Sequence, residues 1–451
     1  MKTTNRGSFS GKLGYILAVA GSAVGLGNIW RFPYLTAKYG GGIFLLVYII
    51  LAVTFGYTLI IAETAIGRKT GKSAIAAFSD LSKKHTWMGY LNGIIPMLIA
   101  PYYCVIGGWV LKYFFIFLKG GAATAATDSY FSEYISQLNA PIFWTIVFIA
   151  CSFLFVVIGV KGIEKASTWM MPILAVLSVI IAIYSVTRPG AMAGLKYYLI
   201  PDFGNFSLMT VVAALGQMFY SLSIAMGVLF AYGSYMNKKI DMEASVKQIE
   251  LFDIGIAFTA GLMVIPAVFS FSGGDSSALQ SGPGLMFETL PKVFNSMSFG
   301  NVIGALFFVL VFFAALTSAI SLVEASIAVF MDRFHLGRKT SCAIMFLITL
   351  CIGIPCSLGF GLWGDVTILG FSILDFFDFL TNSVLMPLAA LCTCYFVSYV
   401  IGIKTVIDEV KISSAFKREK LFTVTIQYIA PLCILVILIC YTLSAFGVFS
   451  I

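Results

Sequence analysis

The chain has 451 residues, of which 60% are hydrophobic and 11% are charged. Soluble proteins carry about 25% charged residues. This composition, together with a mean hydropathy of +0.98, therefore excludes a soluble globular protein and indicates a polytopic membrane protein.

Apolar segments long enough to cross a bilayer recur along the whole chain. A crossing helix needs about 20 apolar residues, and the bilayer requires every backbone polar group to be satisfied internally, which favours helices. We therefore predict an all-α polytopic fold with 11 transmembrane helices. The predicted spans are 13–37, 42–68, 87–118, 141–160, 164–187, 206–236, 246–272, 300–332, 340–359, 371–402 and 425–449.

The basic residues predict the orientation of these helices. Most of the 28 lysines and arginines fall at the N-terminus and in or beside the alternate connections 69–86, 161–163, 237–245, 333–339 and 403–424. The positive-inside rule makes these connections cytoplasmic. We therefore expect a plasma-membrane protein with a cytoplasmic N-terminus and an extracytoplasmic C-terminus. The net charge of +8 then reflects contact with anionic lipid of the bilayer, and no nucleic-acid partner is expected.

The first span is interrupted at mid-depth by residues 21–34, GSAVGLGNIWRFPY. Gly21, Gly25 and Gly27 lie close together, and each glycine weakens a helix by about 1 kcal/mol relative to alanine. Close helix packing is one explanation, because small residues let two backbones approach. A broken helix is the other explanation, and its free amides and carbonyls would bind a carboxylate and cations.

The sixth span contains a matching interruption, SLSIAMG at 221–227, which favours the broken-helix explanation. Paired breaks at corresponding positions of two halves indicate a transport site at the bilayer midplane. We therefore predict a single transporter domain, 1–451, with helices 1–5 in a first repeat at 13–187. Helices 6–10 form a second repeat at 206–402, and helix 11 follows at 425–449. From these residues alone we expect a secondary transporter of a small anionic or zwitterionic solute.

Several ordered motifs, read together, resemble the neurotransmitter:sodium symporters across spans 1–10. The resemblance implies sodium-coupled uptake of amino acids or related amines, on a 5+5 inverted-repeat fold with helices 1 and 6 broken. Many bacterial members of that family have eleven helices. The motifs are GSAVGLGNIWRFPY at 21–34, GGG at 40–42, Glu63 followed by Gly67-Arg68, Tyr102-Tyr103, GQMFYSLSIAMG at 216–227, FFAALTS at 312–318 and LDFFDF at 374–379.

The resemblance also implies two sodium sites made of oxygen donors, which suit a hard cation. The first would consist of the Ala23 carbonyl, the Asn28 amide oxygen, the Ser221 carbonyl and hydroxyl, and Asp253. The second would consist of the carbonyls of Gly21, Val24 and Ala314 with the hydroxyls of Thr317 and Ser318.

Asp253 departs from most of the family, which has asparagine at this place. The alignment there needs a one-residue gap, because a count back from Ile265-Pro266 ends on Phe252, which cannot bind a cation. A structural acid at the inner end of the helix is the alternative role for Asp253. With a carboxylate in the first site and Ala257 one turn further on, we expect no chloride dependence.

The substrate is expected between the two breaks, with its carboxylate at the amides near Leu26-Gly27, at the Tyr103 hydroxyl and at the first sodium. The predicted substrate-binding residues are Ala23, Leu26, Gly27, Ile99, Tyr103, Tyr220, Ser223, Met226, Ser318 and Leu322. Met226 stands where several members of the family carry a bulky aromatic, and a flexible thioether can move aside for a ring. We therefore expect a neutral, large hydrophobic or aromatic amino acid. Ser22 in place of an acid argues against a monoamine.

Two gates are implied by the remaining charged residues. Arg31 and Asp378 resemble an outer pair that closes above the substrate, with Tyr103 and Tyr220 as a lid. Arg6 and Asp332 resemble an inner pair, with Tyr235 packed nearby, although ordinary loop charge also explains these two residues.

Three other functions remain as alternatives: a non-transporting amino-acid sensor, a channel on the same fold, and a symporter of a small osmolyte-like solute. An enzyme is not expected. His85 and His335 both lie in inner loops, and no nucleophile and base occur together in the sequence.

Overall fold

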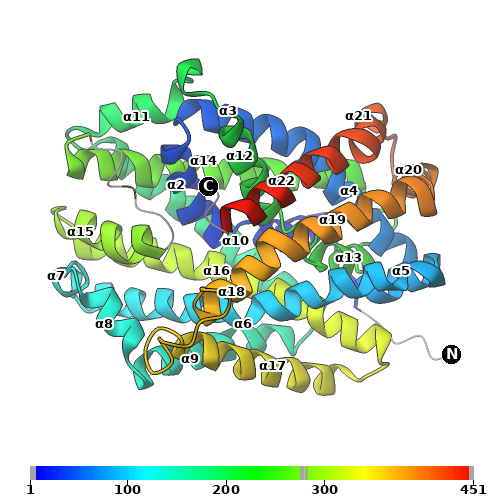
Figure 1. Cartoon of the computed structure of the whole chain (residues 1–451), viewed down its shortest axis with the longest axis horizontal. Coiled ribbons are helices and arrows are strands. Elements are labelled where there is room, and N and C mark those ends of the chain that lie inside the picture. The colour runs from blue at the N-terminus through cyan, green and yellow to red at the C-terminus, as the bar shows by residue number, and fades with distance from the viewer. Residues whose placement is uncertain (1–6, 275–278, 280–282, 446–451) are drawn as a thin grey trace.

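The computed structural model describes residues 7–274, 279 and 283–445, and these residues form a bundle of helices (Figure 1). No strand occurs within these ranges, where Gly41–Pro201 and Ile368–Phe371 form isolated bridges. The α-helices are α1 (Lys12–Ala23), α2 (Phe32–Lys38), α3 (Gly42–Leu51), α4 (Tyr57–Thr70), α5 (Ala74–Leu81), α6 (Thr86–Leu118), α7 (Ala122–Ala125), α8 (Tyr130–Ser136), α9 (Asn139–Val156), α10 (Val160–Val186), α11 (Ala191–Leu199), α12 (Leu208–Ser221), α13 (Val228–Ser234), α14 (Met242–Ser272), α15 (Leu290–Asn295), α16 (Gly300–Arg333), α17 (Arg338–Leu358), α18 (Ile373–Asp378), α19 (Met386–Tyr395), α20 (Ile403–Lys411), α21 (Glu419–Val424) and α22 (Ala430–Ala445).

Short π-helical and 3₁₀ segments connect several of these helices, so that some pairs form one continuous span. The π-helical segments are η1 (Gly27–Arg31), η2 (Ala52–Gly56), η6 (Leu285–Thr289), η7 (Phe379–Leu385), η8 (Phe396–Val400) and η9 (Thr425–Ile429). The 3₁₀ turns are η3 (Lys83–His85) and η4 (Phe203–Asn205).

Within the described part of the chain, 9 helical segments are long and apolar enough to cross a membrane. They are Gly42–Thr70, Lys83–Leu118, Asn139–Val156, Val160–Val186, Met242–Ser272, Gly300–Arg333, Arg338–Leu358, Ile373–Val400 and Glu419–Ser444. A tenth is obtained when Lys12–Ala23 and Gly27–Lys38, which meet at a bend of 56°, are taken as one span. The predicted span at 206–236 is divided between α12 and α13, each too short to cross alone. The last span begins at Glu419, earlier than the predicted 425, and 446–449 lie outside the described residues.

The first span breaks between α1 and η1, where neighbouring side chains leave no room for a Cβ atom at two glycines. A Cβ at Gly25 would lie 2.8 Å from the Ser318 hydroxyl and 3.0 Å from the Tyr103 hydroxyl. A Cβ at Gly27 would lie 2.5 Å from the Tyr220 ring. Val24 adopts an extended conformation and ends α1. The break therefore lies where these side chains reach the backbone of the first span.

The sixth span breaks between α12 and α13, and its backbone there is strained. Ser223 and Ala225 have positive φ angles of 53° and 59°, and Gly227 has φ 71°. Left-handed backbone at a residue other than glycine costs free energy and is maintained only where the surroundings require it. The packing around the sixth span therefore maintains this break.

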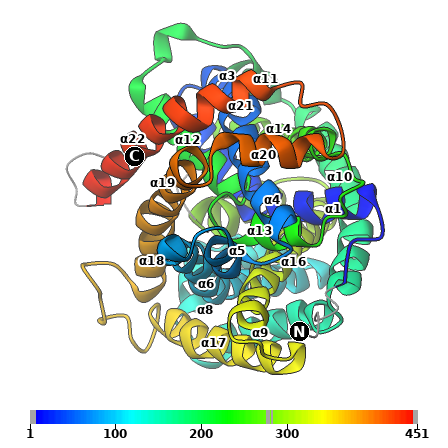
Figure 2. The ribbon, with the colours of Figure 1, turned by 90° about the vertical axis from the view of Figure 1, so that its right-hand side faces the viewer.

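The remaining helices enclose these two breaks. α6 packs along α16 and α9, while α10 and α16 both contact α1. Viewed along the bundle, α22 lies at the periphery beside α12 and α19 (Figure 2). The short helices α5, α20 and α21 lie at one end of the bundle, and α7, α8, α11 and α15 lie at the other (Figure 1). The two breaks therefore face each other in the interior, between the two ends.

Candidate functional site

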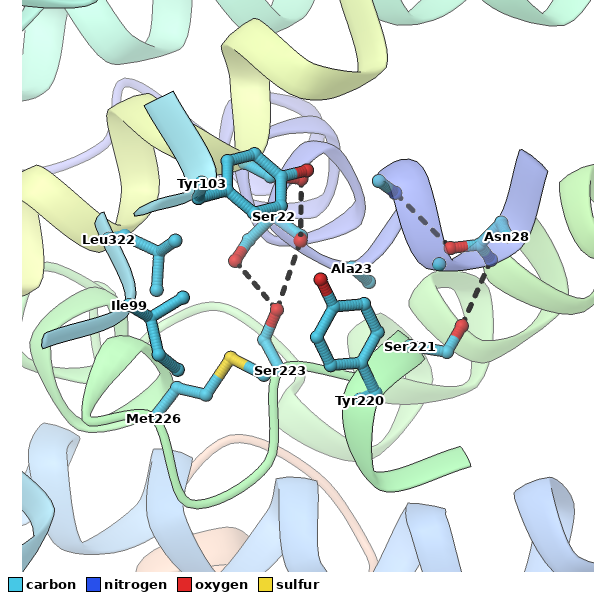
Figure 3. Close-up of a pocket in the computed structure, with 13 residues that line it drawn as sticks. Ser22, Ala23, Asn28, Ile99, Tyr103, Tyr220, Ser221, Ser223, Met226 and Leu322 are labelled. Atoms are coloured by element: carbon cyan, nitrogen blue, oxygen red, sulfur yellow. Dashed lines mark hydrogen bonds between the residues drawn. The ribbon is translucent and has the colours of Figure 1, made fainter. Parts of the chain in front are cut away.

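A pocket lies between the two broken spans and is closed laterally by α6 and α16 (Figure 3). Its volume is about 20 Å³, which is room for a water molecule. It is lined by Ser22, Ala23, Gly25, Gly27, Asn28, Ile99, Tyr103, Tyr220, Ser221, Ser223, Met226, Ser318 and Leu322. The structure thus brings together all the predicted substrate-binding residues except Leu26, whose backbone amide donates to the Tyr103 hydroxyl over 3.3 Å.

One end of the pocket holds a buried polar cluster made by the residues predicted for the first sodium site. The Asn28 amide nitrogen donates to Asp253 Oδ1 over 2.7 Å and to the Ser221 hydroxyl over 2.9 Å. The Ser221 hydroxyl also donates to Asp253 Oδ1 over 2.8 Å. Asp253 is fully buried, so its carboxylate needs these donors or a cation to offset the loss of water. Ala23 lines the same pocket.

The cluster is held by two further elements. α14 begins after Asp241, whose side chain accepts a hydrogen bond from the Ala244 amide, and Asp253 follows about three turns later. From α3, the Tyr48 hydroxyl donates to Asp253 Oδ2 over 3.0 Å. The sequence did not indicate Tyr48, because a lone tyrosine in an apolar span has no distinguishing pattern.

The residues predicted for the second sodium site also meet, beside the first break. The Ser318 hydroxyl lies 3.3 Å from the carbonyl oxygens of both Gly21 and Val24. The Thr317 hydroxyl donates to the Ala314 carbonyl over 3.1 Å, and a Cβ at Gly21 would lie 3.2 Å from Thr317 Cβ. Hydroxyl and carbonyl oxygens from α1 and α16 therefore gather in one small volume.

The two breaks are tied to each other and to α4. The Ser223 hydroxyl donates to the Ser22 carbonyl over 3.0 Å, and the two serine hydroxyls also lie 3.0 Å apart (Figure 3). On the far side, the fully buried Glu63 accepts a hydrogen bond from the Ala225 amide over 2.9 Å. Glu63, which the sequence placed in one of the motifs that resemble the family, thus satisfies a backbone amide that the break leaves free.

Of the two residues predicted for the outer gate, Arg31 lies against Tyr220, which lines the pocket. The Arg31 guanidinium lies 5.4 Å from the centre of the Tyr220 ring and donates to the Tyr441 hydroxyl over 3.4 Å. Asp378 accepts a hydrogen bond from the Asn382 amide over 2.6 Å. In the described chain no direct ion pair joins Arg31 to Asp378, so each residue has a different immediate partner from the one expected.

The segment η6 packs beside the first broken span, next to Arg31. Phe287 of η6 is buried against Trp109 and stacks on Phe131, with ring centres 4.9 Å apart in the stacked pair. The Tyr113 hydroxyl donates to the Phe287 carbonyl over 2.9 Å. The ring of Trp30, the residue before Arg31, packs edge-on against the same Phe287 ring, with the two ring centres 6.3 Å apart. η6 is therefore fixed directly against the second half of the first broken span.

Beside Tyr235, one of the residues predicted for the inner gate, the described residues contain an ion pair between Glu324 and Arg338. Arg6 lies outside the described residues, and Asp332 accepts hydrogen bonds from the Ser73 amide and hydroxyl over 2.6 and 2.7 Å. The Tyr235 hydroxyl donates to Glu324 over 2.7 Å, and Arg338 forms an ion pair with Glu324 at 2.5 Å.

The pair of Glu324 and Arg338 joins several helices. The Arg338 guanidinium also donates to the Val156 carbonyl at the end of α9. The network therefore links α9, α13, α16 and α17 below the pocket. From the sequence, Arg338 was expected only as one of the basic residues of the predicted cytoplasmic connection 333–339.

Three comparisons identify the family. The model of the sodium:neurotransmitter symporter family matches residues 6–134 and 131–447. A Bacillus subtilis protein described as an uncharacterized sodium-dependent transporter, YhdH, is 34% identical over 437 residues, covering 95% of this chain and 96% of its own. The sodium- and chloride-dependent GABA transporter 2 of Homo sapiens is 27% identical, covering 75% of this chain and 64% of its own.

A solved structure gives the same result for the fold. The crystal structure of MhsT in complex with L-phenylalanine superimposes with a TM-score of 0.87 at 36% identity, covering 97% of this chain and all of the other. These similarities agree with a helical bundle that has broken spans around a central pocket. The chain belongs to the sodium:neurotransmitter symporter family and is a sodium-dependent membrane transporter of that family.

Proposed function

We propose that this protein imports a large, neutral, hydrophobic or aromatic amino acid together with two sodium ions. The observation that carries the proposal is the convergence of both broken spans on one pocket, with an oxygen cluster at Asp253 and another at Ser318. Backbone amides and carbonyls at the breaks supply complementary charge for the carboxylate and ammonium groups of a zwitterion.

The substrate's carboxylate would bind at the amides of Leu26 and Gly27, at the Tyr103 hydroxyl and at the first sodium. Tyr103 already contacts the Leu26 amide, so this hydroxyl can exchange the amide for the substrate. The ammonium group would bind carbonyls near Ala23 and in the 220–223 stretch. Binding of both ends at the breaks leaves the substrate side chain to the apolar part of the pocket.

The part of the pocket that would hold the substrate's side chain favours a large apolar group. Ile99, Met226 and Leu322 form its wall, and no ionised side chain is among the described lining residues. A volume of about 20 Å³ is too small for an aromatic ring, so the wall has to move when the substrate enters. Met226 is suited to this because an unbranched thioether changes rotamer at low cost. MhsT, with 36% identity, was crystallised with L-phenylalanine.

Sodium would enter both oxygen clusters as co-transported substrate. At the first site the Asn28 amide has to rotate, because its nitrogen now faces Asp253 and its oxygen accepts from the Gly25 amide over 3.2 Å. Cation binding would thereby release the Gly25 amide and reshape the break next to the substrate carboxylate. This rotation provides a physical link between sodium and substrate binding. The Asp253 carboxylate would supply the negative charge at this site, without chloride.

Import would follow alternating access on the expected architecture. Counting α12 and α13 as one broken span gives eleven transmembrane helices, with inverted repeats at 13–187 and 206–402 and an additional helix at 425–449. The N-terminus would be cytoplasmic in the plasma membrane and the C-terminus extracytoplasmic. Arg31 and Asp378 would gate the outer side, and Arg6, Asp332 and Tyr235 the inner side.

A small osmolyte-like solute is the second candidate, because relatives include GABA and taurine transporters. The taurine transporter of Canis lupus familiaris is 25% identical over 91% of this chain. Those relatives are named as chloride-dependent, whereas Asp253 provides a fixed carboxylate in the cluster described above. We favour the amino acid for this reason and for the apolar wall of the pocket.

Binding of radiolabelled solutes to the purified protein tests the proposal. The panel contains L-phenylalanine, L-leucine, L-alanine, GABA and taurine, each with sodium and with choline in its place. We expect saturable binding of the large apolar amino acids in sodium alone, with or without chloride. Selective binding of GABA or taurine would establish the second candidate. Binding of any solute that ignores sodium would contradict the proposed coupling.

A further inference from the structure

The last helix of the bundle reaches the outer gate through one side chain. Tyr441 of α22 accepts a hydrogen bond from the Arg31 guanidinium over 3.4 Å. It is the one hydrogen bond that the Arg31 side chain makes to the residues described here. A guanidinium carries five N–H donors, and a half-buried one depends strongly on each acceptor that it has. Tyr441 is therefore a main polar contact of a gate residue, although it lies on a peripheral helix.

The position of Tyr441 is determined by a notch in the sixth span. A Cβ added to Gly216 of α12 would lie 2.0 Å from the Tyr441 hydroxyl oxygen and 2.6 Å from the ring carbon that carries it. Only glycine lets the phenol approach this closely. The tyrosine thus fits against α12 one turn above Tyr220, the residue whose ring lies beneath Arg31.

A small cavity confirms that these groups share one space. Arg31, Gly216, Tyr220, Asn382 and Tyr441 all line it, together with apolar residues of α19 and α22. The cavity connects the first span, the sixth span, α19 and α22 on the outer side of the substrate pocket. Movement of any one of these elements therefore changes the contacts of Arg31.

Arg31 has two acceptors within its surroundings, and they belong to different helices. Asp378 is held by the Asn382 amide over 2.6 Å, and the same amide contacts the Tyr102 hydroxyl over 3.4 Å. In the present arrangement Arg31 binds Tyr441 and lies over the Tyr220 ring, while Asp378 is engaged elsewhere. In this arrangement, therefore, the hydrogen bond of the Arg31 side chain goes to Tyr441 of α22 and not to Asp378.

We propose that Tyr441 is a positioning residue of the outer gate, which holds Arg31 over Tyr220 while the gate is closed. Through this contact α22 takes part in closure. The proposal rests on the proposed function, since it assigns Arg31 to the gate. It adds a residue and a helix that the pairing of Arg31 with Asp378 does not include.

The first test measures the exposure of Arg31 and requires no substrate. Purified protein is treated with an arginine-modifying dicarbonyl reagent, and the rate of modification at Arg31 is followed by peptide mass spectrometry. Tyr441→Phe keeps the ring in the Gly216 notch and removes the hydroxyl, so Arg31 should react about threefold to tenfold faster. Tyr428→Phe is the matched control, because it removes the hydroxyl of a tyrosine in the same span that is 63% exposed. An unchanged rate in Tyr441→Phe would overturn the proposal.

The second test measures release of bound amino acid after dilution in sodium. Tyr441→Phe should release it about threefold to tenfold faster at an unchanged melting temperature. In an Arg31→Gln background the same substitution should add nothing. Equal acceleration in both backgrounds would show that Tyr441 acts through packing and not through Arg31, and would overturn the proposal. If the wild type binds no amino acid, the proposed function fails, while the modification test still decides the role of Tyr441.

Discussion

Replacing Asp253 with asparagine keeps the shape of the side chain and removes its negative charge. The carboxylate is fully buried and accepts hydrogen bonds from Asn28, Ser221 and Tyr48 at 2.7 to 3.0 Å. In the variant, the amide of asparagine brings its own N–H groups into a cluster already composed of donors. A sodium ion at this place would lose its formal counter-charge, and part of its oxygen shell would change.

The size of the effect follows from the electrostatics. Two unit charges 4 Å apart attract by about 4 kcal/mol at an effective dielectric of about 20. Reorganisation of the cluster and the remaining dipoles offset part of this loss, so we expect about 1–3 kcal/mol, which is roughly a 5- to 150-fold change in sodium affinity.

Sodium titration of amino-acid binding measures this change. Purified wild type and Asp253→Asn are titrated with sodium at constant ionic strength, using choline as the replacement, so that screening stays the same. Tyr48→Phe is the matched comparison, because it keeps the carboxylate and removes one donor; we expect at most about a fivefold change. An unchanged half-saturating sodium concentration in Asp253→Asn would show that Asp253 is a structural acid, and the first sodium site would have to be placed elsewhere.

Three other predictions follow from the same geometry. Gly25→Ala should weaken amino-acid binding by about 5- to 150-fold, because its Cβ would lie 2.8 Å from the Ser318 hydroxyl and 3.0 Å from the Tyr103 hydroxyl, and overpacking costs about 1–3 kcal/mol. Equilibrium binding checks this, and wild-type affinity would contradict it. Ser318→Ala should make the sodium dependence of binding less steep, because one cation site loses a ligand; an equally steep titration would refute a second site there. Arg338→Gln leaves the buried Glu324 without its cation, so the inner side should open more often, since breaking such a pair costs about 3–5 kcal/mol. Amide hydrogen exchange measures this, and we expect it to be faster in α13 and at the end of α16. Unchanged exchange would show that Arg338 takes no part in inner closure.

The sequence predicted those parts of the site that lie within continuous motifs. Asn28, Ser221 and Ser318 each lie within a motif that resembles the family, so their convergence could be expected from the sequence alone. The break in the sixth span could also be expected, because small and hydroxyl residues interrupt an apolar run at 221–227. Helix ends differed by several residues, as at the last span, because apolar composition does not define where a helix begins.

Residues that act through a single long-range contact could not be found in this way. Tyr48, Arg338 and Tyr441 are one tyrosine in an apolar run, one basic residue in an inner loop and one tyrosine near the end of the chain. Their importance depends on which helix packs opposite them, and no local pattern carries that information. Arg31 and Asp378 show the related difficulty, because their charges suggest a pair although packing gives each a closer partner.

The most direct test of sodium-coupled import is accumulation of L-phenylalanine in proteoliposomes with sodium outside, with and without an inside-negative membrane potential. Two sodium ions that enter with a neutral amino acid carry two charges, so 100 mV adds about 4.6 kcal/mol, or roughly a 10³-fold accumulation. We predict that the inside-negative potential raises accumulation steeply and that choline in place of sodium abolishes it. Equal concentrations inside and outside, or accumulation that persists without sodium, would contradict the account.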